Sequence, residues 1–187
     1  MMIMRGKNLE SNERIIHGGV SSQIVKVKPE FHLFWGGPCS QWYPCKFYDP
    51  AMDMFFNCTE QYMMYHKAKL FGDEDAMDKI MSTQDPKIQK GIGRKVKNFD
   101  ADKWNEVCRT IVYRGNLFKF TQNRKLLVFL MEHKDEYFVE ASPYDKIWGI
   151  GLGEEDPDAL DKSKWLGTNW LGVAINQVRD TLLEWYC

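Results

Sequence analysis

The sequence is poor in the features that mark secreted, membrane-spanning and metal-stabilised proteins. Its five cysteines are odd in number, with no C-x-x-C pair and no spacing typical of zinc ligands. Residues 1–10 lack the apolar core of a signal peptide, and no apolar run approaches the roughly 20 residues that span a bilayer. We therefore expect free thiols, no structural metal, no membrane partner and a cytoplasmic location, or a nuclear one if the source is eukaryotic.

Motifs of several large enzyme classes are also missing. The chain has no G-x-S-x-G turn, no P-loop and no dinucleotide fingerprint, and Gly91-Ile92-Gly93-Arg94 is only a short glycine pair. The net charge of −1 supplies no overall attraction to nucleic acid. One short segment is basic, and it is either a solvated face or a phosphate-binding patch. Its members are Lys87, Lys90, Arg94, Lys95 and Lys97.

What is present is typical of one globular domain. The 187 residues are 44% apolar and 27% charged, which supports a proper core and excludes extended disorder. The seven tryptophans indicate heavy packing or stacking on a flat ligand. We interpret residues 1–22 as a loose N-terminal leader and residues 23–187 as a single domain.

Periodicity and capping signals predict a mainly α-helical fold with a few short strands. Strands are expected at 24–27, 31–35 and 137–140, with an aromatic-rich loop region at 39–57. The expected helix caps are Thr59, Asp85, Asp100 and Asn123. The last helix carries one apolar stripe that should pack as core, made of Leu171, Ile175, Val178, Leu182 and Trp185.

Two segments carry candidate chemistry. In the helix after Thr59, Glu60 and Lys67 share one face at a spacing of about 10 Å along the axis. Glu60 also sits where a purely structural glutamate would stabilise the first turn. In the second segment, Asp145 and Trp148 lie on a loop that continues into Gly149. That loop either contacts a ligand, with Trp148 stacking on a base, or packs its aromatic side chain against the core.

The order of the short motifs resembles the NADAR (YbiA-like) family of N-glycosidases from about Phe31 to Leu183. The motifs are Ser40-Gln41-Trp42, Glu60-Gln61-Tyr62 with Lys67, Gly93-Arg94, Trp104-Asn105-Glu106, Asp145-x-x-Trp148-Gly149 and Gly167-Thr168-Asn169-Trp170-Leu171-Gly172. The resemblance implies a compact helical catalytic domain that cleaves a ribosyl C–N bond without a cofactor or metal. It assigns Glu60, Lys67 and Asp145 to catalysis. The implied substrate-binding residues are Ser40, Trp42, Arg94, Trp104, Trp148, Gly149 and Asn169.

The resemblance implies two substrate classes. One is ADP-ribose on guanine bases of nucleic acid, and the other is phosphoribosylated aminopyrimidines of riboflavin biosynthesis. Two departures favour the first class: Gln41 replaces the usual asparagine of the loop, and Ile150 stands where some bacterial members have an acid. For mechanism, either Glu60 stabilises the oxocarbenium-like state and orients water, or Lys67 forms a Schiff base. A non-catalytic module that binds ADP-ribose or NAD is the alternative of another class.

Overall fold

The computed structural model describes residues 13–15, 24–26 and 30–186. Its helices are α1 (Thr59–Leu70), α2 (Glu74–Met81), α3 (Pro86–Gly93), α4 (Ala101–Gln122), α5 (Arg124–Glu132) and α6 (Trp170–Tyr186). Its strands are β1 (Glu13–Ile15), β2 (Ile24–Lys26), β3 (Glu30–Phe34), β4 (Phe47–Asp49), β5 (Met54–Phe56) and β6 (Glu136–Glu140). The predicted mainly helical fold class is confirmed.

Most of the predicted leader lies outside the described residues. Its described part, β1, pairs antiparallel with β2, the first predicted strand. Among the described helices, none is long and apolar enough to cross a membrane. The four cysteines in the described part are buried free thiols: Cys39, Cys45, Cys58 and Cys108.

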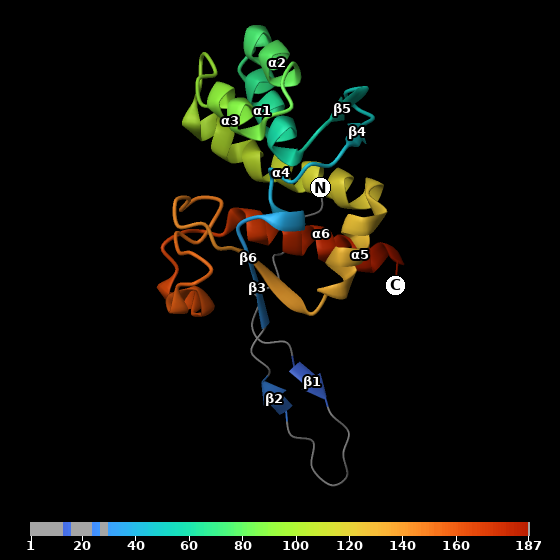
Figure 1. The fold of residues 1–187 in the computed structure, drawn as a ribbon, viewed down its shortest axis with the longest axis vertical. Helices are drawn as coiled ribbons and strands as arrows, with labels where there is room; N and C mark the ends of the chain where they lie inside the picture. The colour runs from blue at the N-terminus through green and yellow to red at the C-terminus, as the bar shows by residue number, and fades with distance from the viewer. Residues whose placement is uncertain (1–12, 16–23, 27–29, 187) are drawn as a thin grey trace, which may run out of the picture.

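The described elements form two groups on either side of the long helix α4 (Figure 1). Helices α1, α2 and α3 pack against one another at one end. The β3–β6 pair and α6 pack together at the other end. Because α4 contacts both α1 and α6, it joins the two groups.

Helix starts follow the predicted caps with one correction. Asp85 and Asp100 accept hydrogen bonds from the first turns of α3 and α4, as expected. Thr59 is the first residue of α1 instead of its cap, because the Cys58 thiol accepts the Gln61 amide. Asn123 holds the cap position of α5, but its side chain makes no capping bond there.

Two elements were not anticipated by the sequence patterns. Helix α2 begins at the Asp73 cap directly after the turn that ends α1, and only Ala76 and Ile80 of this helix are buried. The predicted loop region 39–57 contains the antiparallel hairpin β4–β5. Both elements are too short to show a clear period in the sequence.

The parallel pairing of β3 with β6 joins segments far apart in the chain. Its register aligns Phe34 with Glu140 at the end of both strands, and the Ala141 amide continues the ladder to the Phe34 carbonyl. The loops that follow the two strands therefore leave the sheet side by side. This pairing places the Ser40-Gln41-Trp42 loop beside the Asp145–Trp148 loop.

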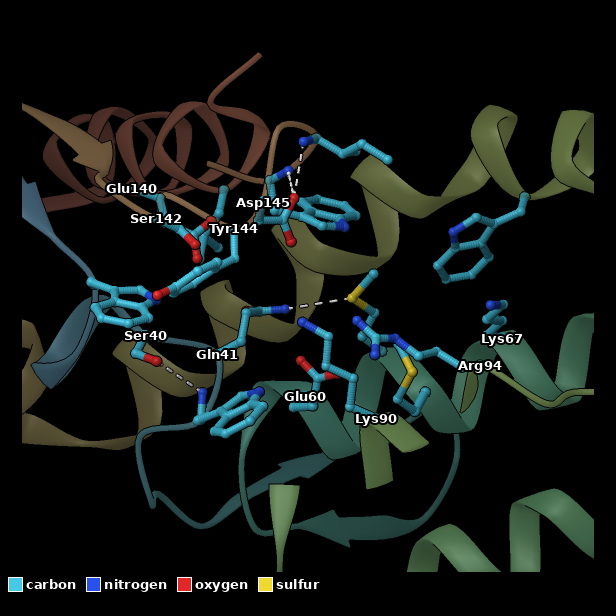
Figure 2. A pocket seen from close by; sticks show the side chains of 18 residues that line it. Ser40, Gln41, Glu60, Lys67, Lys90, Arg94, Glu140, Ser142, Tyr144 and Asp145 are labelled. Atoms are coloured by element: carbon cyan, nitrogen blue, oxygen red, sulfur yellow. Dashed lines mark hydrogen bonds between the residues drawn. The ribbon is translucent and has the colours of Figure 1, made fainter. Parts of the chain in front are cut away.

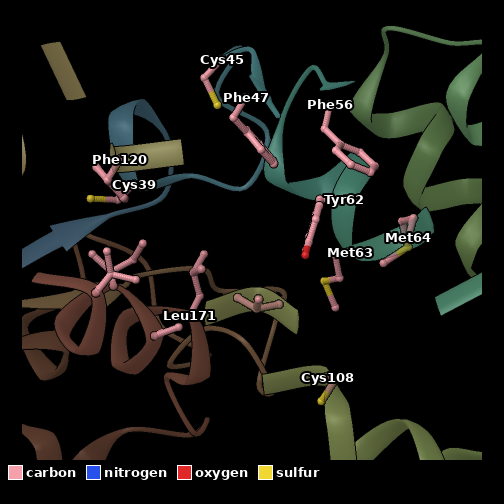
Figure 3. Packing of buried hydrophobic residues seen from close by; sticks show 14 of the residues in the cluster. Cys39, Cys45, Phe47, Phe56, Tyr62, Met63, Met64, Cys108, Phe120 and Leu171 are labelled. Atoms are coloured by element: carbon pink, nitrogen blue, oxygen red, sulfur yellow. The ribbon is translucent and has the colours of Figure 1, made fainter. Parts of the chain in front are cut away.

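Helix α1 runs through the interior and is buried on most of its surface. Tyr62 packs between Phe47 and Phe56 (Figure 3). Its hydroxyl donates to Oδ2 of Asp49 at 2.9 Å, and Asp49 has no exposed surface. On α6 the predicted stripe is buried as far as Leu182, whereas Trp185 is exposed.

We expect Tyr62→Phe to lower the free energy of unfolding by about 1.5–3 kcal/mol, because a buried carboxylate loses a hydrogen bond. The matched control is Tyr48→Phe, which removes the solvent-exposed Tyr48–Asp53 bond. This control should cost less than about 0.5 kcal/mol. Urea denaturation of both variants measures the difference, and equal losses would contradict the assignment.

Candidate active site

A cavity of about 650 Å³ opens between the two groups of elements (Figure 2). Eight of the ten predicted site residues line it. They are Ser40, Trp42, Glu60, Lys67, Arg94, Trp104, Asp145 and Trp148. The structure thus brings together residues from five separate stretches of chain, and their individual roles stay predictions.

Glu60 lines this cavity from α1 and is only 4% exposed. Its amide is bound by the Gln41 carbonyl at 3.0 Å, which ties the start of α1 to the neighbouring loop. Burial raises the pKa of the Glu60 carboxyl to about 7, although Lys90 and a hydrogen bond from Trp42 both oppose the rise. Glu60 can therefore exchange a proton near neutral pH.

Lys67 lies on the same face of α1, against aromatic rings. Its ammonium is 4.2 Å from the ring centre of Phe99 and 5.7 Å from that of Trp104. Burial lowers the pKa of Lys67, and the nearby Arg94 lowers it further while Glu60 opposes the change. A lysine in this setting releases its proton more readily than an exposed one.

The Ser40-Gln41-Trp42 loop is held in place by hydrogen bonds from side chains of α4. The fully buried Lys119 donates to the Ser40 carbonyl at 2.8 Å, and the side chain of Asn116 donates to Oε1 of Gln41 at 3.0 Å. Ser40 Oγ accepts the Trp42 amide at 3.2 Å. These bonds hold the indole of Trp42 at the cavity, where it donates to Glu60.

The Asp145 loop lines the cavity and also packs against neighbouring residues, so ligand contact by this loop stays a prediction. Oδ1 of Asp145 accepts the amides of Ile147 at 2.9 Å and Trp148 at 2.8 Å, so this carboxylate shapes its own turn. Trp148 lines the cavity and also meets Trp170 edge to face, with ring centres 5.7 Å apart. Packing fixes the Trp148 ring while one part of it remains available to a ligand.

Gly149 and Asn169 stand behind the cavity wall. The Asn169 side chain forms hydrogen bonds with the backbone of β6. It accepts one from the Glu140 amide at 2.8 Å and donates one to the Phe138 carbonyl at 3.2 Å. A side chain at Gly149 would come within 2.9 Å of the carbonyls of Asp145 and Glu140. Both residues therefore position the wall, and neither is among the residues that line the cavity.

The sequence patterns missed several lining residues. Lys90 of the basic segment is one of them and reaches the cavity together with the predicted Arg94, whereas Lys97 is exposed and its Nζ lies 3.8 Å from Oδ1 of Asp73. The other missed members are Trp35, Gln41, Met63, Met64, Glu140, Ser142, Tyr144, Ile147 and Leu171. Glu140 closes β6, and burial raises the pKa of its carboxyl to about 8. A single glutamate at the end of a short strand carries no sequence signal for such an environment.

Within the described residues, one group has the makings of a metal site: His32, His133 and Glu136. It lies at the opposite end of β6 from Glu140. The two imidazoles already bond to separate oxygens of Glu136, at 2.9 Å and 2.7 Å. This arrangement is a hydrogen-bonded cluster away from the cavity.

The NADAR domain model matches residues 33–183, which is most of the chain. The chain belongs to the NADAR family. It is 41% identical over 175 residues to N-glycosidase R617 of Acanthamoeba polyphaga mimivirus, covering 92% of this chain and 98% of the relative. It is 37% identical over 179 residues to protein irg-1 of Caenorhabditis elegans, covering 87% and 83%.

A more distant relative is N-glycosidase Npun_R5314 of Nostoc punctiforme, 26% identical over 132 residues, with 70% of this chain and 76% of the relative covered. The NMR structure of E. coli YbiA shares the fold, with a TM-score of 0.68 and 20% identity over 84% of this chain and 88% of that one. The predicted family and the predicted enzyme class, an N-glycosidase, are confirmed.

We expect Trp42→Phe to raise the pKa of Glu60 above about 7, because the indole N–H favours the ionised carboxylate. Trp35→Phe is the control, since Trp35 lines the same cavity and makes no bond to Glu60 that contributes to this pKa. Carboxyl ¹³C titration by NMR measures both variants. A Trp42→Phe protein with an unchanged Glu60 pKa would refute the assigned hydrogen bond.

Proposed function

We propose that this NADAR protein hydrolyses the bond between ADP-ribose and a guanine base, with Glu60 and Lys67 at the reacting carbon. The observation that carries the proposal is the setting of Glu60. Its buried carboxyl, with a pKa of about 7, shares one cavity with tryptophans and with three cationic side chains. In ribosyl C–N hydrolysis a carboxylate can balance the developing charge, aromatic rings can stack on the base, and cations can bind phosphates.

The cavity wall suits each part of such a substrate. Trp42 and Trp148 supply aromatic surface for the guanine ring. Lys90 and Arg94 lie on the α3 side, where they can neutralise a pyrophosphate. The departures at Gln41 and Ile150 from the riboflavin-type members support the same choice of substrate.

Cleavage of a ribosyl C–N bond passes through an oxocarbenium-like state. As the bond breaks, positive charge develops at C1′, and an ionised Glu60 stabilises that charge. Glu60 then accepts a proton from the attacking water, which adds to C1′. In the alternative scheme the ribose ring opens, and the neutral Lys67 amine attacks C1′ and displaces the guanine amine to form a Schiff base. Water then hydrolyses this Schiff base and releases the sugar.

The substrate assignment is tested by incubating the protein with guanine-ADP-ribosylated DNA and, separately, with a phosphoribosylated aminopyrimidine. We expect release of ADP-ribose from the DNA. Release of ribose 5-phosphate alone would identify the phosphoribosylated aminopyrimidine as the substrate, which the same cavity also suits. Tight ADP-ribose binding without release from either would instead indicate a binding module.

Glu60→Gln should lower kcat by at least about 100-fold, because the amide can neither balance the developing charge nor take a proton. In the wild type the rate should fall as the pH drops below about 7, since the Glu60 carboxylate becomes protonated. Glu132→Gln, at an exposed position on α5, is the control. A Glu60→Gln enzyme with near-normal kcat would remove Glu60 from the mechanism.

The two schemes separate under borohydride. If Lys67 forms a Schiff base, reduction during turnover attaches the sugar covalently to Lys67, and mass spectrometry of the digested protein locates it. Lys67→Arg keeps the charge and should abolish the adduct. If the wild type and Lys67→Arg both turn over fully and neither forms an adduct, water is the nucleophile.

A further inference from the structure

Glu140 is the carboxylic acid of the cavity that neither the family motifs nor the proposed mechanism employ. It comes from the β6 wall, across the cavity from Glu60 on α1 (Figure 2). Its Oε2 is buried and has no hydrogen-bond partner among the described residues. A buried polar atom left unpaired at a ligand cavity indicates a partner on the ligand.

The backbone holds this side chain in a fixed place. The Glu140 amide donates to Asn169, and its carbonyl accepts the Ile150 amide at 2.9 Å. Pairing of Glu140 with Phe34 in the β3–β6 register adds a third constraint. The carboxyl therefore faces the cavity from rigid sheet structure, as a proton donor requires.

We propose that Glu140 is the general acid of the N-glycosidase reaction, giving its proton to the leaving nitrogen. The inference rests on the ribosyl C–N cleavage proposed above. When the C1′–N bond breaks, its electron pair stays with the nitrogen, which takes the Glu140 proton. Water adds to C1′ and passes a proton to Glu60. Proton exchange with solvent then resets both carboxyls, so atoms and charges balance.

The surroundings of the two glutamates divide the roles between them. Glu60 receives the Trp42 indole N–H and faces Lys90, which both favour a carboxylate. Glu140 receives no such donor. Burial raises the pKa of Glu140 to about 8, Asp145 and Glu60 raise it further, and Lys90 opposes them. Burial raises the pKa of both carboxyls, and the indole N–H at Glu60 favours the ionised base there, which leaves Glu140 as the acid.

Asp145 is the third carboxyl of the cavity, and one of its two oxygens already has hydrogen-bond partners. Oδ1 of Asp145 accepts two amides of its own turn. Ser142 and Tyr144 also line this side, but their hydroxyls are far weaker acids than a carboxyl. Glu140 is the carboxyl of this wall whose buried oxygen has no hydrogen-bond partner among the described residues.

The test compares pH profiles of kcat/KM for the wild type and Glu140→Gln. The wild-type rate should decline above about pH 8 as Glu140 loses its proton, and the variant should lose at least about 100-fold activity together with this alkaline limb. The matched control is Glu132→Gln, which makes the same chemical change at an exposed position on α5 outside the cavity. Residual activity that keeps the alkaline limb, or activity within about threefold of wild type, would overturn the proposal.

A second measurement does not depend on any variant folding. Carboxyl ¹³C titration of the wild-type protein should show Glu140 still protonated at pH 7, and a Glu140 carboxyl ionised by pH 6 would overturn the proposal. The test also survives a different substrate, because the leaving nitrogen of the phosphoribosylated aminopyrimidine needs a proton as well. Activity on that substrate alone would refute the ADP-ribosyl assignment and leave Glu140 to be judged by the pH profiles.

Discussion

The parallel pairing of β3 with β6 is the constraint on which the site depends. A parallel pair requires a crossover between its strands, and here that crossover includes helices α1 to α5. Its register ends both strands at the Phe34–Glu140 pair. The loops leaving the pair form one wall of the cavity, and α1, carried within the crossover, forms the facing wall.

Burial sets the chemistry of this site more than any single ion pair. It raises the pKa values of Glu60 and Glu140 and lowers that of Lys67, so each group moves toward its neutral form. The differences among them come from neighbours. Lys90, an indole N–H and Arg94 favour the ionised form of Glu60, whereas at Glu140 the effect of Lys90 is opposed by Asp145 and Glu60.

Much of the fold could be predicted from the sequence because helix capping and helical periodicity depend on residues close together in the chain. Asp85 and Asp100 start α3 and α4 where their side chains satisfy free amides, and the stripe of α6 follows the helical period. The short elements were not predicted because they contain too few residues to show a hydrophobic period. Helix α2 and the β4–β5 hairpin owe their stability to packing on neighbours, which a local pattern does not record.

By itself the sequence determined the family, the enzyme class and eight of the residues around one cavity. These could be predicted because the order of the motifs is a property of the sequence and needs no coordinates. Only the tertiary structure decided their surroundings. It placed Asn169 behind the wall, brought Lys90 to the cavity and buried the Oε2 atom of Glu140 across the cavity from Glu60. Whether a side chain is buried, and whether its polar atoms find a partner, depends on segments distant in sequence. These properties are therefore set only when the chain folds and those segments meet.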